Sequence, residues 1–237
     1  MMQEEKIHKS SLFVTLTYDN ENVPRTPRGF KTLTKRDPQL FIKRLREYEK
    51  CNTIKYYLCG EYGGETFRPH YHAIIFDATP EGVLKCWKHG YVNIGNVEEG
   101  SIAYCVKYLD KGKQIPMHDK DDRLPEFALM SKGMGKNYLT PQVVDYHRKN
   151  ESFTVTLPGG IVQAMPRYYR DKIYPEIDGV KDPIRLRIKA RLDRKFNTLF
   201  EQRVKQHGSV FDYYRNMHEG VKACFENFKN KQKSRKL

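Results

Sequence analysis

Residues 54–77 read IKYYLCGEYGGETFRPHYHAIIFD. Aromatic and β-branched residues dominate both ends of this segment, and such residues favour strands. The glycines within residues 62–68 are typical of a turn. We therefore predict two antiparallel strands, over residues 54–61 and 69–77, that are joined as a hairpin.

The flanking sequence supplies further elements of the same domain. Residues 11–17 are apolar and β-branched, which predicts a strand. Asp37-Pro38 predicts the start of a helix over 38–50, with Asp37 as its cap. Three more elements are expected: a short helix over residues 80–88, a strand over 91–97 and a helix over 100–111. This order predicts an α+β fold, in which flanking helices cover a central, mostly antiparallel sheet.

The C-terminal half is predicted to be mainly helical. We expect a loop with some helix over residues 115–135 and a hairpin over 152–164. A basic amphipathic helix follows over 184–206, and a second helix over 209–228. The inward side chains of the basic helix are expected to be Ile188, Leu192, Phe196, Leu199 and Val204. The predicted domains are a main domain over residues 1–180, a basic helical extension over 181–228 and a disordered basic tail over 229–237.

Composition restricts the class of protein. The chain has 237 residues, a formal net charge of +14 and a mean hydropathy of −0.77. An excess of basic residues favours a polyanionic partner, most often nucleic acid. No apolar run reaches the ~18 residues that a membrane helix needs, and the first residues lack the core of a signal peptide. The five cysteines form no CxxC pair, which fits a reducing cytoplasm rather than a disulfide framework or a zinc knuckle.

The hairpin carries a candidate metal site. Alternate residues of a strand share a face, so His70 and His72 point the same way, about 7 Å apart along the strand. Glu61 ends the preceding strand and would face them across the hairpin. Two imidazoles and one carboxylate suit Mn²⁺ or Mg²⁺ and leave positions open for substrate. Glu65 and Asp77 are alternative third ligands, and a purely structural His pair is the simpler interpretation.

The helix over 100–111 presents a second set of polar groups. Tyr104, Lys107, Tyr108 and Lys111 cluster opposite its apolar side. A phenol with a pKa near 10 is a poor nucleophile at neutral pH, but nearby cations favour the phenolate. Attack on a DNA phosphate would leave a covalent phosphotyrosine link. The alternative is a pair of exposed tyrosines on a solvated helix face.

Candidate DNA contacts lie on the first strand and the first long helix. Thr15, Thr17 and Tyr18 could contact phosphates and bases together with basic side chains. An ordinary edge strand is the alternative. The basic side chains included in this hypothesis are Lys43, Arg44, Arg68 and Lys111.

These motifs, in this order, resemble those of a known family. The motifs are FVTLTY, GEYG, RPHYH and YCVKY, beginning at residues 13, 60, 68 and 104. They resemble the rolling-circle replication initiators of the HUH endonuclease superfamily, and more narrowly those of gokushovirus-type microviruses (Microviridae). Further similar segments are 39–46, 133–139 and 166–169, so the resemblance spans about residues 11–175.

The resemblance implies an HUH endonuclease or RRM-like core and a metal-dependent nickase activity. The implied metal ligands are Glu61, His70 and His72. The implied paired nucleophiles are Tyr104 and Tyr108, and Lys107 is the lysine that lies between them in the motif. Members of the family nick one strand at an origin and stay attached to the 5′ phosphate. They leave a 3′ hydroxyl for a host polymerase, and later rejoin the ends into a circle.

The implied partners are single-stranded DNA, origin duplex DNA, and a host helicase and polymerase. A host helicase is expected because the sequence has no Walker-type motif. The expected location is the cytoplasm of the infected bacterial host. Alternatives are a plasmid mobilisation relaxase or a single-strand transposase with the same chemistry, or a non-catalytic nucleic-acid-binding protein. The basic C-terminal helices are expected to clamp duplex DNA, with self-association or a host partner as alternatives.

Overall fold

The computed structural model describes residues 1–50, 53–98, 100–102, 105 and 115–234. Contacts within the chain divide it into two compact units, Met1–Tyr138 (unit 1) and Leu139–Leu237 (unit 2). This division differs from the boundary near residue 180 that the sequence predicts. The predicted extent of the functional domain stays a prediction, and the two units are described separately below.

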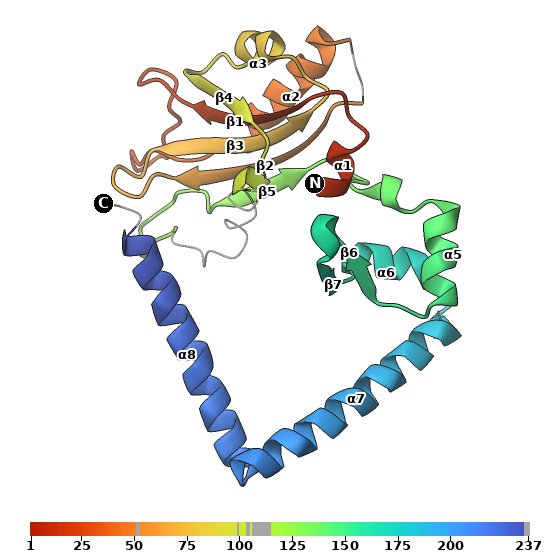
Figure 1. Cartoon of the computed structure of the whole chain (residues 1–237). Helices are drawn as coiled ribbons and strands as arrows, with labels where there is room; N and C mark the ends of the chain where they lie inside the picture. Colours follow the sequence, from red (N-terminus) through yellow and green to blue (C-terminus); the bar gives the residue numbers. More distant parts are fainter. Residues whose placement is uncertain (51–52, 99, 103–104, 106–114, 235–237) are drawn as a thin grey trace. The chain divides into compact units, whose positions relative to one another are not determined.

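Unit 1 is built on a five-stranded sheet (Figure 1). Its strands lie in the order β4-β1-β3-β2-β5, and every neighbouring pair is antiparallel. The predicted α+β fold is thereby confirmed. In chain order, the strands β1 to β5 are Ser11–Thr17, Lys55–Tyr62, Pro69–Phe76, Val92–Asn96 and Phe127–Met130.

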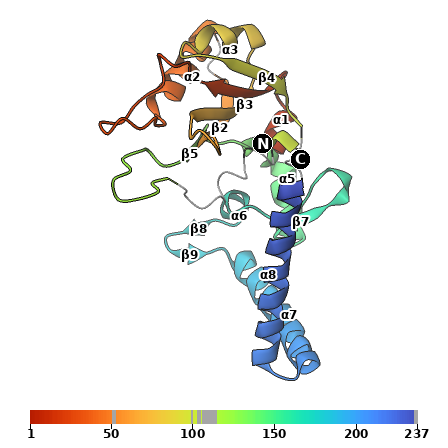
Figure 2. The same cartoon turned by 90° about the vertical axis from the view of Figure 1, so that its left-hand side faces the viewer.

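The helices of unit 1 with described bounds are α1 (Met2–Glu5), α2 (Arg36–Tyr48) and α3 (Pro80–Cys86). The amphipathic α2 buries Phe41, Ile42 and Leu45, and α2 and α3 lie together on one face of the sheet (Figure 2). Residues 100–102 and 105 are helical, as predicted, while the remainder of the expected helix lies outside the described residues.

The predicted cap of α2 is wrong. The N-cap position is Lys35, no side chain caps the helix, and Asp37 lies inside its first turn. The Asp37 carboxylate instead accepts a hydrogen bond of 2.7 Å from the buried hydroxyl of Tyr18. The local pattern assigns Asp37 to the cap, but its carboxylate is used in a tertiary hydrogen bond to Tyr18 instead.

The sequence also failed to predict β5. Phe127–Met130 contains no β-branched residue and is four residues long, so its local propensity for a strand is weak. It becomes a strand because it pairs with the exposed edge of β2, where Cys59 lies opposite Ala128. Pairing with an existing edge satisfies backbone groups that a loop would leave to water.

The two faces of the sheet bury different side chains. One face packs Val14, Leu16 and Tyr71 against α2 and α3; we call it the helix face. The other face buries a smaller cluster that includes Tyr57 and Ile74; we call it the hairpin face. The polar residues of the hairpin motif lie on this second face, as the following section describes.

Unit 2 contains short elements followed by two long helices. The short elements are α5 (Pro141–Lys149), β6 (Thr154–Thr156), β7 (Val162–Ala164), α6 (Arg167–Ile173), β8 (Glu176–Ile177) and β9 (Val180–Lys181). The long helices are α7 (Pro183–His207) and α8 (Val210–Ser234). A 3-10 turn at Pro158–Gly160 belongs to this unit, while another at Lys136–Tyr138 ends unit 1. The strands β6 and β7 confirm the predicted hairpin over 152–164, with its turn at Pro158–Gly160.

The long helices differ from the prediction in two respects. The helix α8 continues to Ser234, into the segment expected to be disordered. Of the five side chains expected to point inward from α7, Ile188 is buried and Val204 is half-buried, whereas Leu192, Phe196 and Leu199 are exposed. The amphipathic pattern is present, but within unit 2 only the ends of α7 are packed. Among the described residues, no helix combines the length and apolarity needed to cross a membrane.

Candidate metal centre

The register of the β2–β3 hairpin brings three metal-ligand side chains to the hairpin face. Glu61 is the direct cross-strand partner of His70, and Cys59 is the partner of His72. Directly opposed residues share a face, and so do alternate residues of one strand. Glu61, His70 and His72 therefore converge, as the sequence predicts.

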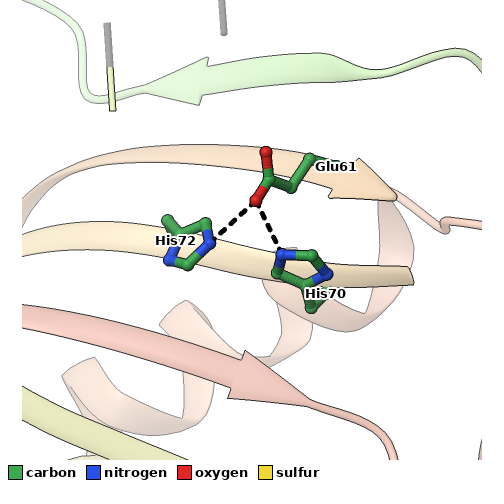
Figure 3. Close-up of side chains that lie close together, drawn as sticks. All are labelled: Glu61, His70 and His72. Atoms are coloured by element: carbon green, nitrogen blue, oxygen red, sulfur yellow. Dashed lines mark hydrogen bonds and ion pairs between the residues drawn. The ribbon is translucent and has the colours of Figure 1, made fainter. Parts of the chain in front are cut away.

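The three side chains are in direct contact (Figure 3). One carboxylate oxygen of Glu61, Oε1, accepts hydrogen bonds from Nε2 of His70 at 2.7 Å and Nε2 of His72 at 3.0 Å. The ring centroids of the two histidines are 5.0 Å apart. The candidate ligand atoms all lie within 4.8 Å of one another. A single ion could therefore be held by all three residues.

Burial makes the charges of this cluster strongly interdependent. Glu61 is 4% exposed, and burial alone would raise its pKa. The hydrogen bonds from both histidines outweigh burial and lower the pKa of Glu61 to about 2. For His70, burial favours a lower pKa, but the hydrogen bond to Glu61 prevails and the pKa is raised. Without an ion, the carboxylate therefore stays ionised.

The outer nitrogens of both imidazoles are also engaged. Nδ1 of His70 donates to the carbonyl oxygen of Arg68 at 3.1 Å, and Nδ1 of His72 is 3.0 Å from the hydroxyl of Thr15. The ring of Phe13 stacks on His72 with a centroid distance of 5.8 Å. Such contacts fix the ring orientation of metal-binding histidines and leave Nε2 directed at the ion.

The donor set fits a divalent cation. Two imidazole nitrogens and a carboxylate oxygen are ordinary ligands for such ions, and three protein ligands leave coordination positions for substrate. The alternative ligands are placed elsewhere. Glu65 is exposed in the turn, and the carboxylate of Asp77 accepts from Nδ1 of His8 at 2.6 Å and from the backbone of Lys9.

Two buried cysteines lie on the same face, next to the histidines. Cys59 donates its thiol hydrogen to the carbonyl oxygen of His72 at 3.6 Å. It is also hydrogen-bonded to Cys105; this contact, burial and the nearby Glu61 charge raise the pKa of the Cys59 thiol. Cys105 and Ile102 pack into the hairpin-face cluster, so this part of the 100–111 segment lies against the metal-site face. Sequence alternation placed Cys59 on this face but did not reveal its contact with Cys105.

The predicted nucleophiles, Tyr104 and Tyr108, and the nearby Lys107 and Lys111 lie outside the described residues. Their predicted roles therefore remain predictions. Cys105, which adjoins Tyr104 in the chain, is the nearest described residue on the hairpin face.

The predicted DNA contacts on β1 have different surroundings. Thr15 contacts His72, as described, and the hydroxyl of Thr17 donates to the carbonyl of Tyr91 at 3.2 Å. Tyr18 is 1% exposed, with its hydroxyl between Asp37 and Tyr71. A contact between Tyr18 and DNA is at odds with this burial, because the phenol belongs to the core on the helix face.

The predicted basic contacts are also dispersed. Lys43 is exposed on α2, and Nε of Arg44 donates to the carbonyl of Cys86. The helix α2 covers the helix face, opposite the candidate metal ligands. Arg68 is nearer the hairpin, but it donates to Asn20 and to the carbonyl of Tyr18. A DNA path that includes all of these groups would have to extend around the sheet.

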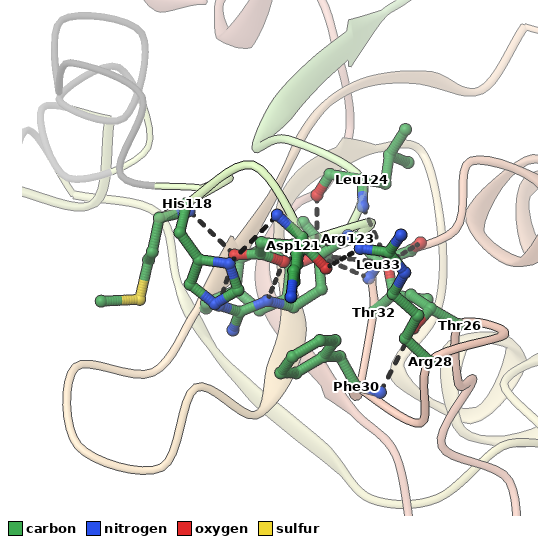
Figure 4. Close-up of polar contacts among 12 residues, drawn as sticks. Thr26, Arg28, Phe30, Thr32, Leu33, His118, Asp121, Arg123 and Leu124 are labelled. Atoms are coloured by element: carbon green, nitrogen blue, oxygen red, sulfur yellow. Dashed lines mark hydrogen bonds and ion pairs between the residues drawn. The ribbon is translucent and has the colours of Figure 1, made fainter.

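The sequence did not predict a cluster of contacts around Arg123 at the end of the hairpin, which we call the Arg123 clasp. Arg123 forms a two-pronged ion pair with Asp121, with N–O distances of 2.8 and 2.7 Å (Figure 4). Its guanidinium also lies over the rings of Phe30, Tyr62 and Phe67, 5.4 to 5.5 Å from their centroids. The clasp joins three segments distant in sequence, so no local pattern could reveal it. It fixes Tyr62, the neighbour of Glu61, against the loop that carries Arg123.

The antiparallel sheet, with a His-hydrophobic-His pair and a carboxylate on one hairpin, has the arrangement that the resemblance to HUH proteins implies. Residues 11–113 match the family of replication-associated proteins of the ORF2 type. The matched region includes the three candidate ligands. The predicted resemblance to replication-associated proteins of small single-stranded DNA phages is confirmed.

Individual relatives agree with this assignment. The chain is 31% identical over 204 residues to the replication-associated protein VP4 of Bdellovibrio phage phiMH2K, with 73% of this chain and 62% of that protein covered. It is 26% identical over 235 residues to the replication-associated protein ORF2 of Spiroplasma virus 4, covering 86% of this chain and 70% of that protein. The corresponding protein ORF4 of Chlamydia phage 1 is 25% identical over 196 residues, covering 71% and 47%. The chain thus spans about half to two thirds of these relatives' lengths, and no solved structure matches it.

Proposed function

We propose that this chain is a replication initiator that nicks an origin strand by tyrosine attack and later rejoins DNA ends during rolling-circle replication of a single-stranded DNA phage. The observation that carries the proposal is the convergence of Glu61, His70 and His72 on one hairpin, inside the region that matches a family of replication-associated proteins. A non-catalytic DNA-binding protein would have no need for this arrangement.

The three side chains would hold Mg²⁺ or Mn²⁺. When bound, such an ion polarises a phosphate oxygen and neutralises the negative charge that builds up on it. The chain itself keeps Glu61 ionised and ready to act as a ligand, because two imidazoles donate to it. Thr15 and the carbonyl of Arg68 hold the imidazole rings in place.

The proposed step is a transesterification. The phenolic oxygen of Tyr104 or Tyr108 forms a bond to phosphorus, and the bond from phosphorus to the 3′ oxygen of the preceding nucleotide breaks. The phenol loses its proton, and the departing oxygen gains one to become a free 3′ hydroxyl. Lys107 would favour the phenolate through its charge. Because the phosphodiester energy is retained in the phosphotyrosine link, attack by a 3′ hydroxyl can reverse the step and rejoin DNA ends.

The proposed partners follow from this reaction. The chain would bind single-stranded and origin duplex DNA inside the infected bacterial cell. The free 3′ hydroxyl of the nicked DNA strand would serve a host polymerase. A host helicase would separate the strands. The helix α7 exposes basic side chains, which we propose contact duplex phosphates; they are Arg187, Lys189, Arg191, Arg194 and Lys195.

The test uses the full chain and labelled single-stranded DNA of the replicon that encodes it, with Mn²⁺. The expected product is a protein–DNA band that survives denaturation and is lost in the Tyr104→Phe, Tyr108→Phe double variant. EDTA should abolish the band and added Mn²⁺ should restore it. DNA binding by the double variant should stay within about twofold of the unmodified chain, because only two hydroxyls are removed.

Tyr91→Phe is the matched control, because Tyr91 is a highly exposed tyrosine of unit 1. It should form the covalent band at the normal rate. Mapping of the linked peptide to a residue other than Tyr104 or Tyr108, or cleavage that persists in the double variant, would contradict the proposed nucleophiles. Binding without any covalent product would instead favour a non-catalytic protein.

A further inference from the structure

The helix α8 carries a regular apolar stripe. Val210, Tyr214, Met217, Val221 and Cys224 follow one another at intervals of four, three, four and three residues. This spacing averages 3.5 residues and keeps side chains on one side of a helix that packs along another helix. We call these five residues the α8 stripe.

The α8 stripe is exposed. Val210, Tyr214, Met217 and Val221 are between 47% and 50% exposed, and Cys224 is also exposed. Phe211 and Phe225 extend the apolar surface beside it. Part of the surface forms a shallow pocket of about 530 Å³. It is lined by Met217, Gly220, Val221, Cys224 and Phe225. A contiguous apolar surface of this kind on a water-soluble helix marks a contact site.

Within unit 2, α7 covers only the beginning of α8. Phe200 lies 5.3 Å from the ring of Tyr213 and 6.0 Å from that of Tyr214, and His207 lies 5.9 Å from Tyr213. Among the described residues, ring contacts between the two helices are confined to this end. The rest of the stripe, from Met217 onward, therefore presents its apolar side chains to solvent.

Unit 1 offers no matching surface in the part of the chain that the structure describes. Its exposed large apolar side chains are single residues on separate elements. They are Ile7, Tyr48, Leu84, Tyr91, Met117 and Met130. A second α8 is a better match, because four of the five stripe residues, Tyr214, Met217, Val221 and Cys224, are placed symmetrically about position 219. An antiparallel copy sets Met217 opposite Val221, and Tyr214 opposite Cys224, so that large side chains meet smaller ones.

The available area agrees with a specific interface. Aromatic side chains bury roughly 150–250 Å² each when covered completely. Phe211, Tyr214 and Phe225 of α8 are at least half exposed, and with the half-exposed Val210, Met217 and Val221 they offer roughly 600 Å² per copy. Specific interfaces bury about 1,200–2,000 Å² over both partners, so two such surfaces reach the lower end of that range. The flanks of the α8 stripe bear Phe211, His218 and Phe225 rather than like charges, so two copies can approach closely.

We propose that the chain forms a homodimer in which the α8 stripes of two copies pack antiparallel. The pairing would be isologous, since each copy contributes the same surface. It would also place two basic α7 helices in one assembly, which would strengthen binding to duplex DNA without any new contact.

The test is the mass of the full chain in solution, measured by light scattering over a range of concentrations. The expected mass at high concentration is twice the 28.0 kDa of one chain. Met217→Lys and Val221→Lys should each weaken dimerisation by at least about thirtyfold, because a charge would be buried at the centre of the interface. Ala223→Lys, on the opposite side of the same helix, should leave the dimer unchanged.

Helix content measured by circular dichroism should be the same in all variants, so that loss of the dimer is not loss of fold. A monomer at every concentration, or a dimer that is insensitive to both stripe variants, would overturn the proposal. The arrangement has its own test, in a Tyr214→Cys variant treated with oxidised glutathione. A disulfide between position 214 of one copy and Cys224 of the other supports antiparallel pairing, and linkage of Cys224 to Cys224 overturns it. Neither test depends on cleavage activity.

Discussion

The helix face and the hairpin face of the same sheet use polar groups in opposite ways. On the helix face, the hydroxyl of Tyr18 donates to Asp37, and the hydroxyl of Tyr71 donates to the carbonyl of Thr34, so the polar atoms are paired inside a core. On the hairpin face, a single oxygen of Glu61 accepts from two histidines. That oxygen and both imidazole nitrogens can exchange their hydrogen bonds for a metal ion.

This difference teaches where stability and chemistry reside. The helix face contains most of the large buried side chains, which hold the sheet together. The hairpin face contains fewer apolar residues, and on it Glu61 is hydrogen-bonded to both histidines. We expect substitutions on the hairpin face to affect metal binding and cleavage, and those on the helix face to affect the free energy of unfolding.

The largest expected effect is on the shared carboxylate. Glu61→Gln removes the negative ligand while keeping the side-chain volume, so metal-dependent cleavage should fall by at least about a thousandfold. Cleavage rates at saturating Mn²⁺ measure this effect. Glu65→Gln, in the exposed turn, should retain the normal rate. Unchanged Mn²⁺ affinity in Glu61→Gln would show that the carboxylate is not a ligand.

A smaller effect is expected for a residue that contacts a ligand rather than the ion. Thr15→Val removes the hydroxyl that contacts Nδ1 of His72, so Mn²⁺ affinity should fall by about tenfold to a hundredfold. The matched control is Thr17→Val on the same strand, because the Thr17 hydroxyl contacts the carbonyl of Tyr91 instead. Calorimetric titration of both variants decides the matter. Equal weakening in the two would mean that β1 acts only through general packing.

The smallest effect should appear on the opposite face and in a different measurement. Ile75 is fully buried on the helix face, so Ile75→Val should lower the free energy of unfolding by about 0.5–1.5 kcal/mol. Urea unfolding monitored by circular dichroism gives this value, and Ile161→Val at an exposed position should change it little. Mn²⁺ affinity of the folded Ile75→Val protein should be unchanged. A clear loss of affinity would break the contrast between the two faces.

Local sequence predicted the hairpin and the convergence of Glu61, His70 and His72 well. Alternation alone placed His70 and His72 on one face, and a turn of known position brought Glu61 opposite them, because antiparallel register follows from turn length. The first four strands were found for the same reason. Each combines apolar or β-branched residues with clear turns on both sides.

Features made by distant segments could not be predicted. The strand β5 exists because β2 offers an edge, and Asp37 serves Tyr18 rather than its own helix. The Arg123 clasp depends on three rings, those of Phe30, Tyr62 and Phe67, that are distant from Arg123 in the chain. The periodicity of α7 indicated an apolar side correctly, but periodicity does not say whether another surface covers it.

The compactness of the β2–β3 hairpin has a consequence for how the candidate metal ligands come together. Glu61 is separated from His70 by nine positions in the chain and from His72 by eleven, so bringing them together closes only a short loop. Short closures have a low entropic cost and occur early in folding. The three candidate ligands can thus come together early in folding, before the strands from distant parts of the chain have paired.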